Sequence, residues 1–157
     1  MSSDSKAALI DELGRAVVRF QDATQKYDEA VGEIYGLGAT ERLALSFLWD
    51  GPKTATAIAK HTRLTPAAVT ALIDRLEKRR FLRRTADPTD RRKVLVEAAE
   101  ETMKVTADAY LPMRDRGAEI LAKYSEAELR TVIAVMLDTL RVQDEATAEL
   151  LRRHGKV

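Results

Sequence analysis

Two short helical segments joined by only three residues constrain the fold of this chain more than any other feature. Thr65 followed by Pro66 marks a strong helix start, because proline at the first helical position loses no needed N–H. The helix that begins there is expected to run to about Arg79. One face of it carries the apolar residues Val69, Leu72, Ile73 and Leu76. A shorter helix over residues 57–61 precedes it across the tight connection 62–64, so the pair predicts a helix-turn-helix.

A hairpin with a charged tip is expected directly after this helix pair. Residues 81–85 and 93–97 are short strand candidates, and the segment 86–90 between them contains Asp-Pro and Asp residues that favour a turn. Residues 74–93 contain nine Lys or Arg and four Asp or Glu, whereas the whole chain has a formal net charge of only +1. Basic charge is therefore concentrated in one segment, which is the distribution expected of a surface that meets a polyanion.

Long helices are expected on both sides of this central unit. Apolar residues step by threes and fours through residues 1–36 and again through residues 100–124, and Ser125 with Glu128 forms a capping box that starts a last helix. Pro112 is expected to kink the helix over residues 100–124. The apolar faces of these helices are too one-sided to be satisfied by the central unit alone, which predicts a homodimer.

The expected organisation is a single domain over residues 1–157, mainly α-helical with a small β-hairpin. Residues 40–98 would form the DNA-binding lobe, and residues 1–36 and 100–157 would supply the dimerisation helices. Within the lobe, Thr40 and Thr56 are the expected N-caps of the first two helices.

The composition removes several mechanisms. The chain has no cysteine, which excludes disulfides, thiolate metal sites and thiol nucleophiles. Its uncharged apolar stretches run only a few residues and its first residues lack the pattern of a secretion signal, so we expect a cytoplasmic protein with no membrane partner. The two histidines, His61 and His154, belong to no catalytic or metal-binding pattern. We therefore expect no enzyme, no metal and no cofactor.

The second helix of the pair carries the residues that we expect to read DNA. Small side chains at its start would let the backbone approach base edges in the major groove, and they are Thr65, Pro66, Ala67, Ala68, Thr70 and Ala71. Alanine methyls can contact thymine methyls, and Arg75, one turn further along, can reach a phosphate or a guanine. The alternative is an alanine-rich helix that reflects helix propensity alone.

The hairpin tip strengthens the DNA-binding interpretation. Asp90, Arg91, Arg92 and Lys93 lie where a flexible basic loop could enter the adjacent minor groove. By itself such a charge run is more often a solvated turn. Here it follows a candidate recognition helix at the spacing that a wing requires, and the combination is more specific than either part.

From Gly51 to Val96 the sequence GPKTATAIAKHTRLTPAAVTALIDRLEKRRFLRRTADPTDRRKVLV resembles the winged helix-turn-helix of the MarR family of transcription regulators. TPAAVTALIDRLE corresponds to the recognition helix and DPTDRR to the wing. The long flanking helices also resemble the layout of the family, in which the first and last helices of two subunits interlock into a dimer with the DNA-binding lobes beneath. The resemblance thus covers most of the chain.

The resemblance implies roles for the wing residues and a function for the chain. Arg92 would enter the minor groove while Asp90 holds it in place, and Arg91 and Lys93 would favour phosphates. The recognition-helix contacts of the family fall on the same outward-facing residues that periodicity selects. The implied function is that of a dimeric repressor that occludes a promoter by binding a pseudo-palindromic site on double-stranded DNA.

Members of this family often respond to small, frequently aromatic or anionic molecules that bind between the dimer helices and the DNA-binding lobe. Tyr35, Trp49 and Tyr110 are expected on helices that could line such a crevice, where an aromatic ring offers stacking area. The more ordinary alternative is that all three are core aromatics. An effector would weaken DNA binding by favouring a lobe separation that does not match the DNA.

Two positions depart from the family pattern. Arg80 stands where the family usually has glycine after the recognition helix, and an arginine held at positive φ would cost about 1 kcal/mol. The usual Leu-Thr-x-x-Gly after the wing is replaced by AAEET at residues 98–102, so the threonine cap of the next helix is missing. The turn into the wing and the start of that helix are therefore open.

Two other classes of function are weighed against DNA binding. A winged helix can serve as a protein-interaction module, since a fold does not determine a function. Salt separates the two, because binding to several phosphates weakens steeply as salt rises and an apolar protein interface hardly responds. An enzyme is the most distant interpretation, because no nucleophile, base or metal constellation is visible.

Overall fold

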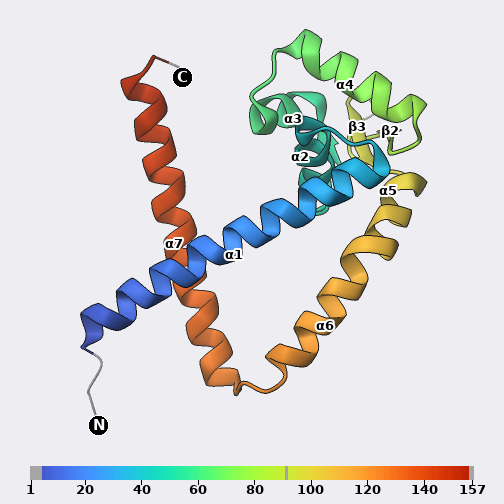
Figure 1. Cartoon of the computed structure of the whole chain (residues 1–157). Coiled ribbons are helices and arrows are strands. Elements are labelled where there is room, and N and C mark those ends of the chain that lie inside the picture. Colours follow the sequence, from blue (N-terminus) through green and yellow to red (C-terminus); the bar gives the residue numbers. More distant parts are fainter. Residues whose placement is uncertain (1–4, 91, 156–157) are drawn as a thin grey trace. The chain divides into compact units, whose positions relative to one another are not determined.

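The computed structural model describes residues 5–90 and 92–155 and consists of two compact units, each described here by itself. The first unit ends at Tyr110 and contains α1 (Lys6–Tyr35), α2 (Ala39–Phe47), β1 (Lys53–Thr54), α3 (Ala55–Thr62), α4 (Pro66–Lys78), β2 (Leu82–Ala86), β3 (Val94–Ala98), α5 (Glu100–Val105) and the π-helix η1 (Thr106–Tyr110) (Figure 1). The second unit contains α6 (Leu111–Leu121) and α7 (Glu126–Arg153). A mainly helical chain with a small antiparallel sheet is the fold class that the sequence predicts.

Two helix boundaries lie where the sequence predicts them, the start of α4 and the end of α1. The hydroxyl of Thr65 accepts a hydrogen bond from the amide of Ala68 at 3.3 Å, and Pro66 is the first residue of α4. The first helix ends at Gly36, which has a left-handed φ of 64° that glycine adopts without a steric penalty. Both signals act within one helical turn, so they need no tertiary context.

The N-caps of α2 and α3 correct the sequence prediction, because each lies two residues earlier. Gly38 precedes α2 in place of Thr40, and its amide donates to the carboxylate of Glu41 at 2.9 Å. Thr54 caps α3 in place of Thr56, and its hydroxyl accepts from the amide of Ala57 at 3.1 Å. Thr54 is extended because it also belongs to β1, which brings it into position to start the helix.

A third strand completes the sheet, and the sequence did not predict it. The strand order is β1-β3-β2 with antiparallel pairs throughout, and Leu82 pairs with Ala98 at one end of the hairpin while Ala86 pairs with Val94 at the other. The hairpin strands begin one residue later than expected. β1 has only two residues, too few to show an alternating pattern, so it is visible only through its pairing with β3.

The core of the first unit lies in the lobe from α2 to β3 and also includes Val105 of α5. The helix α1 joins it only near its C-terminal end. The predicted inner face of α4 is buried as expected: Val69, Leu72, Ile73 and Leu76 are each at most 2% exposed. In α2 the buried apolar residues are Ala44 and Leu45, whereas Leu43 is 42% exposed. The lobe is thus a closed core, with α1 extending away from it (Figure 1).

The long helices expose the apolar faces that their periodicity predicts. On α1 these residues include Leu9, Leu13 and Phe20, each more than half exposed. On α7 they include Ile133, Met136 and Leu140, also more than half exposed. Ser125 caps α7 in the expected capping box with Glu128. In the described part of the chain, no helix is both long and apolar enough to cross a membrane.

A π-helical segment lies just before Pro112, where the sequence predicts a kink. Proline has no N–H to donate to the carbonyl four residues earlier, which here belongs to Asp108, and its ring clashes with that carbonyl. The five residues of η1 widen the helix at this position. One predicted helix over residues 100–124 is therefore three segments, and the boundary between the two units falls at the end of η1.

Candidate nucleic-acid interface

The outer face of α4 presents the small residues that the sequence singles out. Thr65, Pro66, Ala67, Thr70 and Ala71 are exposed, and Ala68 is half-buried. The hydroxyl of Thr70 donates to the carbonyl of Pro66 at 3.0 Å, so toward a base edge it offers its lone pairs. The helix lies at the outside of the lobe, where its exposed face is accessible along its length (Figure 1).

The turn between α3 and α4 contains backbone strain that the sequence did not reveal. Arg63 has a φ of 56°, a left-handed conformation that costs a non-glycine residue about 1 kcal/mol. The amide of Leu64 donates to the carbonyl of Ala59 at 3.2 Å, and the side chain of Leu64 packs against the core. This closed turn sets the direction in which α4 begins.

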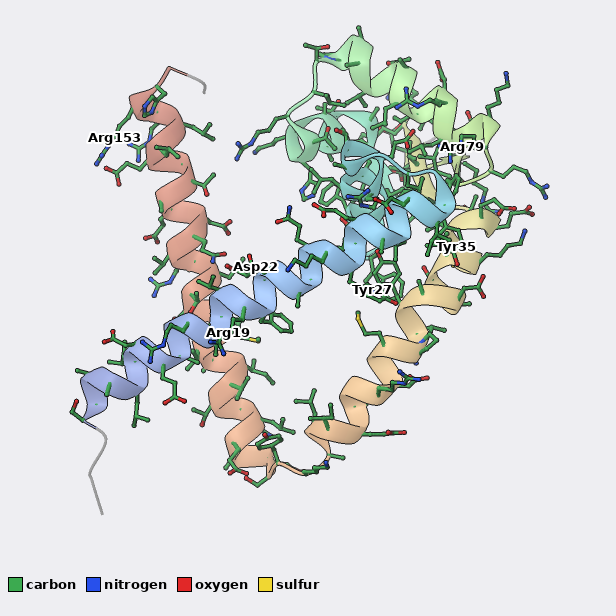
Figure 2. All side chains as sticks on the ribbon, in the orientation of Figure 1. Arg19, Asp22, Tyr27, Tyr35, Arg79 and Arg153 are labelled. Carbon is green, nitrogen blue, oxygen red and sulfur yellow. The ribbon has the colours of Figure 1, made fainter. Side chains whose placement is uncertain are left out.

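The buried carboxylate of Glu41 binds one arginine of α4 and the arginine that directly follows the helix. The side chain of Glu41 is only 8% exposed, and its two oxygens accept from Nε of Arg75 at 2.8 Å and from Nη1 of Arg79 at 3.4 Å. Arg79 also donates through Nη2 to the carbonyls of Tyr35 and Gly36, at 3.1 and 2.9 Å, and its guanidinium lies 4.8 Å from the centre of the Phe81 ring. Figure 2 shows Arg79 and Tyr35 where the end of α4 meets the end of α1.

Burial is the largest single effect on the pKa of Glu41 and raises it, but the opposing effects are larger together. The hydrogen bonds from Arg75 and from the Gly38 amide, with the charges of Arg75 and Arg79, hold the pKa of Glu41 below its ordinary value. Glu41 is therefore ionised at neutral pH. Sequence analysis missed this residue; the one local signal was its position three residues after Gly38, as in a capping box.

The wing tip is organised by two aspartates. One oxygen of Asp87 accepts from the amide and the hydroxyl of Thr89, both at 2.7 Å, and from the amide of Asp90 at 3.1 Å. These hydrogen bonds, the one from the Thr89 hydroxyl first, hold the pKa of Asp87 below its ordinary value. A loop with several backbone hydrogen bonds to one carboxylate is held in a defined shape.

Asp90 lies next to the two described cations of the wing. It accepts from the amide of Arg92 at 3.1 Å, and its oxygens lie 3.9 Å from Nε of Arg92 and 3.8 Å from Nζ of Lys93. The side chain of Arg92 is 96% exposed. This is the proximity that the resemblance implies for Asp90 and Arg92, whose role on DNA stays a prediction. Arg91, the remaining predicted wing residue, lies outside the described residues.

Several arginines of the basic segment are engaged within the lobe. Arg84 of β2 binds Asp74 and Glu77 on α4, with 2.6 Å between its Nη2 and the Asp74 oxygen, and Arg83 binds Glu97 at 2.6 Å across the hairpin. The ion pairs of Arg84 connect the hairpin to α4, and that of Arg83 lies within the hairpin. The local charge count therefore overstates the number of cations available for DNA.

Arg80 adopts the left-handed conformation that its position demands, with a φ of 63°. Its carbonyl accepts from the amide of Glu101 at 3.1 Å, and the carbonyl of Phe81 accepts from the amide of Ala99 at 2.9 Å. The helix α5 begins after Ala99, which offers no side-chain cap. The backbone of the turn thus supplies the partner that the missing threonine would have given to the first turn of α5.

The three aromatic residues proposed for an effector crevice have different environments. Tyr110 donates to Asp28 at 2.9 Å and lies edge-on to Tyr27, with ring centres 6.0 Å apart. Burial, the hydrogen bond to Asp28 and the charge of Asp28 raise the pKa of Tyr110 to about 12. Tyr35 is half-buried against the core. Trp49 corrects the prediction, since it lies in the turn after α2 and not on a helix, and it is 66% exposed.

His61 has a packing role in the lobe. Its ring stacks on that of Phe47 with centres 4.1 Å apart and an angle of 6° between the planes. The described residues contain no cluster of three or more His, Asp or Glu arranged to hold a metal ion.

Comparison with known proteins gives a consistent result. The sequence profile of the MarR family matches residues 35–93, the segment from the end of α1 to the wing. The chain is 30% identical to the uncharacterised HTH-type transcriptional regulator YcgE of Bacillus subtilis over 81% of this chain and 83% of that protein. It is also 30% identical to the HTH-type transcriptional repressor NicR of Pseudomonas putida, over 60% of each chain.

The fold is similar to that of solved regulators. A point mutant of MepR from a multidrug-resistant S. aureus isolate matches with a TM-score of 0.62 at 19% identity, over 85% of this chain and 96% of that one. Another mutant of S. aureus MepR, solved with a bound oligodeoxyribonucleotide, matches with a TM-score of 0.51 at 20% identity, over 85% and 97%. Both likenesses concern the fold.

Proposed function

The chain belongs to the MarR family of DNA-binding transcription regulators, and from this premise we propose that it is a dimeric repressor of a promoter with a pseudo-palindromic site. The family is one of regulators and not of enzymes. Repression follows from occlusion, since a dimer seated on a promoter excludes polymerase. NicR, a relative of this chain, is named a repressor.

The exposed face of α4 beside an ordered basic wing is the observation that carries the proposal. Small side chains from Pro66 to Ala71 let the helix backbone approach base edges, and Thr70 offers a hydroxyl acceptor. The exposed guanidinium of Arg92 in the wing is suited to an adjacent minor groove. As the resemblance to the family implies, Arg91 and Lys93 would favour phosphates. The MepR variant solved with an oligodeoxyribonucleotide has a similar fold.

Dimerisation would give the second half-site. Apolar side chains such as Phe20 on α1 and Met136 on α7 are more than half exposed, at a density that a monomer would not leave in water. Two lobes brought together through these helices would read half-sites about one helical turn, roughly 34 Å, apart. A small aromatic or anionic effector, with Tyr35, Tyr110 and Trp49 as candidate contacts, would release DNA by changing the lobe separation.

Fluorescence anisotropy of promoter duplexes across a salt series tests the proposal. Wild type should bind tightly and selectively, with affinity falling steeply as salt rises. Arg92→Ala should weaken binding roughly ten-fold and lower the salt slope by about one ion. The matched control is Arg130→Ala on α7, which removes the same charge from an arginine that is 80% exposed and lies outside the candidate nucleic-acid interface. This variant should leave the affinity for DNA unchanged. A folded, dimeric protein that binds no duplex at low salt would refute the proposal.

A further inference from the structure

Glu41 is the one charged residue among the described residues that is buried, at 6% exposure. Burying a carboxylate is costly unless it is paired and hydrogen-bonded. Here three donors from three places satisfy it: the amide of Gly38, Nε of Arg75 and Nη1 of Arg79. Arg75 belongs to the recognition helix α4 and Arg79 directly follows it, so this carboxylate bears directly on the surface that meets DNA.

The contact between Glu41 and Arg75 involves only Nε of the guanidinium. Glu41 takes Nε, and within the described residues neither terminal nitrogen of Arg75 has a partner. The Arg75 side chain is 56% exposed and lies one turn beyond Ala71 on the outer face of α4. Two terminal N–H groups in one plane can bind a guanine edge or a phosphate in bidentate fashion.

Anchoring at Nε removes most of the freedom that an exposed arginine otherwise loses on binding. Immobilising such a rotamer-rich side chain on binding has an entropic cost. Glu41 is a suitable anchor because it is itself held by the amide of Gly38 and by Arg79. Arg79 in turn donates to carbonyls at the end of α1. The direction of Arg75 is therefore set by the packed interior of the lobe.

We propose that Glu41 is a positioning residue for DNA selectivity: it orients Arg75 so that its terminal nitrogens meet one base pair of the operator. This inference rests on the proposed operator binding and adds to it a residue that does not itself contact DNA. It predicts that the charge of Glu41 matters for choosing a sequence and not for general attraction to DNA, because Glu41 is anionic and buried.

Glu41→Gln tests the inference with the full-length dimer. Glutamine keeps an oxygen for the Gly38 amide and a similar volume, but it loses the charge that holds Arg75. The probes are a duplex enriched by wild type from a random-sequence pool and a bulk alternating copolymer duplex. The ratio of the two affinities should fall about five-fold or more in Glu41→Gln, while affinity for the copolymer stays equal or rises. In an Arg75→Ala background, Glu41→Gln should change the ratio no further.

Glu97→Gln is the matched control, since it removes one carboxylate paired with an arginine of the same lobe, Arg83, at 2.6 Å. Its affinity ratio should equal that of wild type. Arg75→Lys gives an independent check, because lysine keeps the positive charge but has no Nε or fork, and it should lose selectivity while retaining copolymer binding.

Two results would overturn the inference alone: an unchanged ratio in Glu41→Gln, or an equal fall in the presence and absence of Arg75, which would mean a loosened lobe. Failure of wild type to enrich any sequence from the pool would instead overturn operator binding and the inference with it.

Discussion

Arg80 has a strained backbone conformation that links the end of α4 to the start of α5. Its left-handed backbone aims its carbonyl at the amide of Glu101, and so starts α5 where no side chain caps it. Its side chain pairs with Glu100, but both side chains are largely exposed, so the pair contributes little to stability. The backbone conformation, and not the guanidinium, is therefore the important property of this position.

Arg80→Gly should stabilise the fold by about 0.5–1 kcal/mol, because glycine adopts positive φ without the steric penalty. Urea denaturation followed by circular dichroism measures the change. Arg80→Ala is the control, since it also loses the ion pair but keeps the Cβ atom, and it should bring no gain. Equal stability of the glycine and alanine variants would contradict the claim that strain resides in the backbone.

The shape of the wing is held by hydrogen bonds within its own turn. One carboxylate oxygen of Asp87 accepts hydrogen bonds from Thr89 and Asp90, and the carboxylate of Asp90 accepts one from the amide of Arg92. Arg84 connects the base of the wing to Asp74 and Glu77 of α4. The helix α4 and the wing are thus held together as one element, and it is the element that we propose to face DNA.

Asp87→Ala should weaken operator binding about three- to ten-fold, because the loop that carries Arg92 must then be ordered on binding. The thermal midpoint should hardly change, since none of the described tip residues contributes a side chain to the core. Anisotropy and differential scanning calorimetry measure the two quantities. Asp50→Ala, in the exposed turn after α2, is the control. Unchanged affinity would mean that wing order has no part in binding.

The sequence predicted the elements best where their signals are local. Thr65, Pro66 and Ser125 start helices as expected, because a cap acts within one turn. The sequence-based prediction was wrong at the N-caps of α2 and α3, where it selected the threonines at positions 40 and 56. The choice there depends on the carboxylate of Glu41 and on the pairing of Thr54 with β3, which lies far along the chain.

At the scale of the whole molecule, the apolar faces of the long helices remain to be covered. Phe20 is 65% exposed on α1, and α7 shows a similar stripe that includes Leu137 at 61%. A second copy of the chain is the partner that we propose for them. Covering these faces would also place two lobes on one DNA molecule.

Phe20→Asp should shift the protein from dimer to monomer, because a charge would be buried without a partner in the interface. Sedimentation equilibrium measures the association state. Gln21→Asp, at the neighbouring exposed position, is the control and should remain dimeric. The lobe should keep its fold in both variants because its core lies elsewhere. A dimer of unchanged stability in Phe20→Asp would exclude this face of α1 from the interface.

The sequence by itself determined the helix-turn-helix, the hairpin after it and the amphipathic flanking helices. Capping and periodicity act between residues a few positions apart, and the chain encodes them directly. Only the tertiary structure decided which cations face outward and what holds them. Glu41 and Arg75 are 34 positions apart, and only the packed core brings the carboxylate to the guanidinium. No local pattern contains such a contact, because its energy depends on burial, which exists only once the lobe has folded.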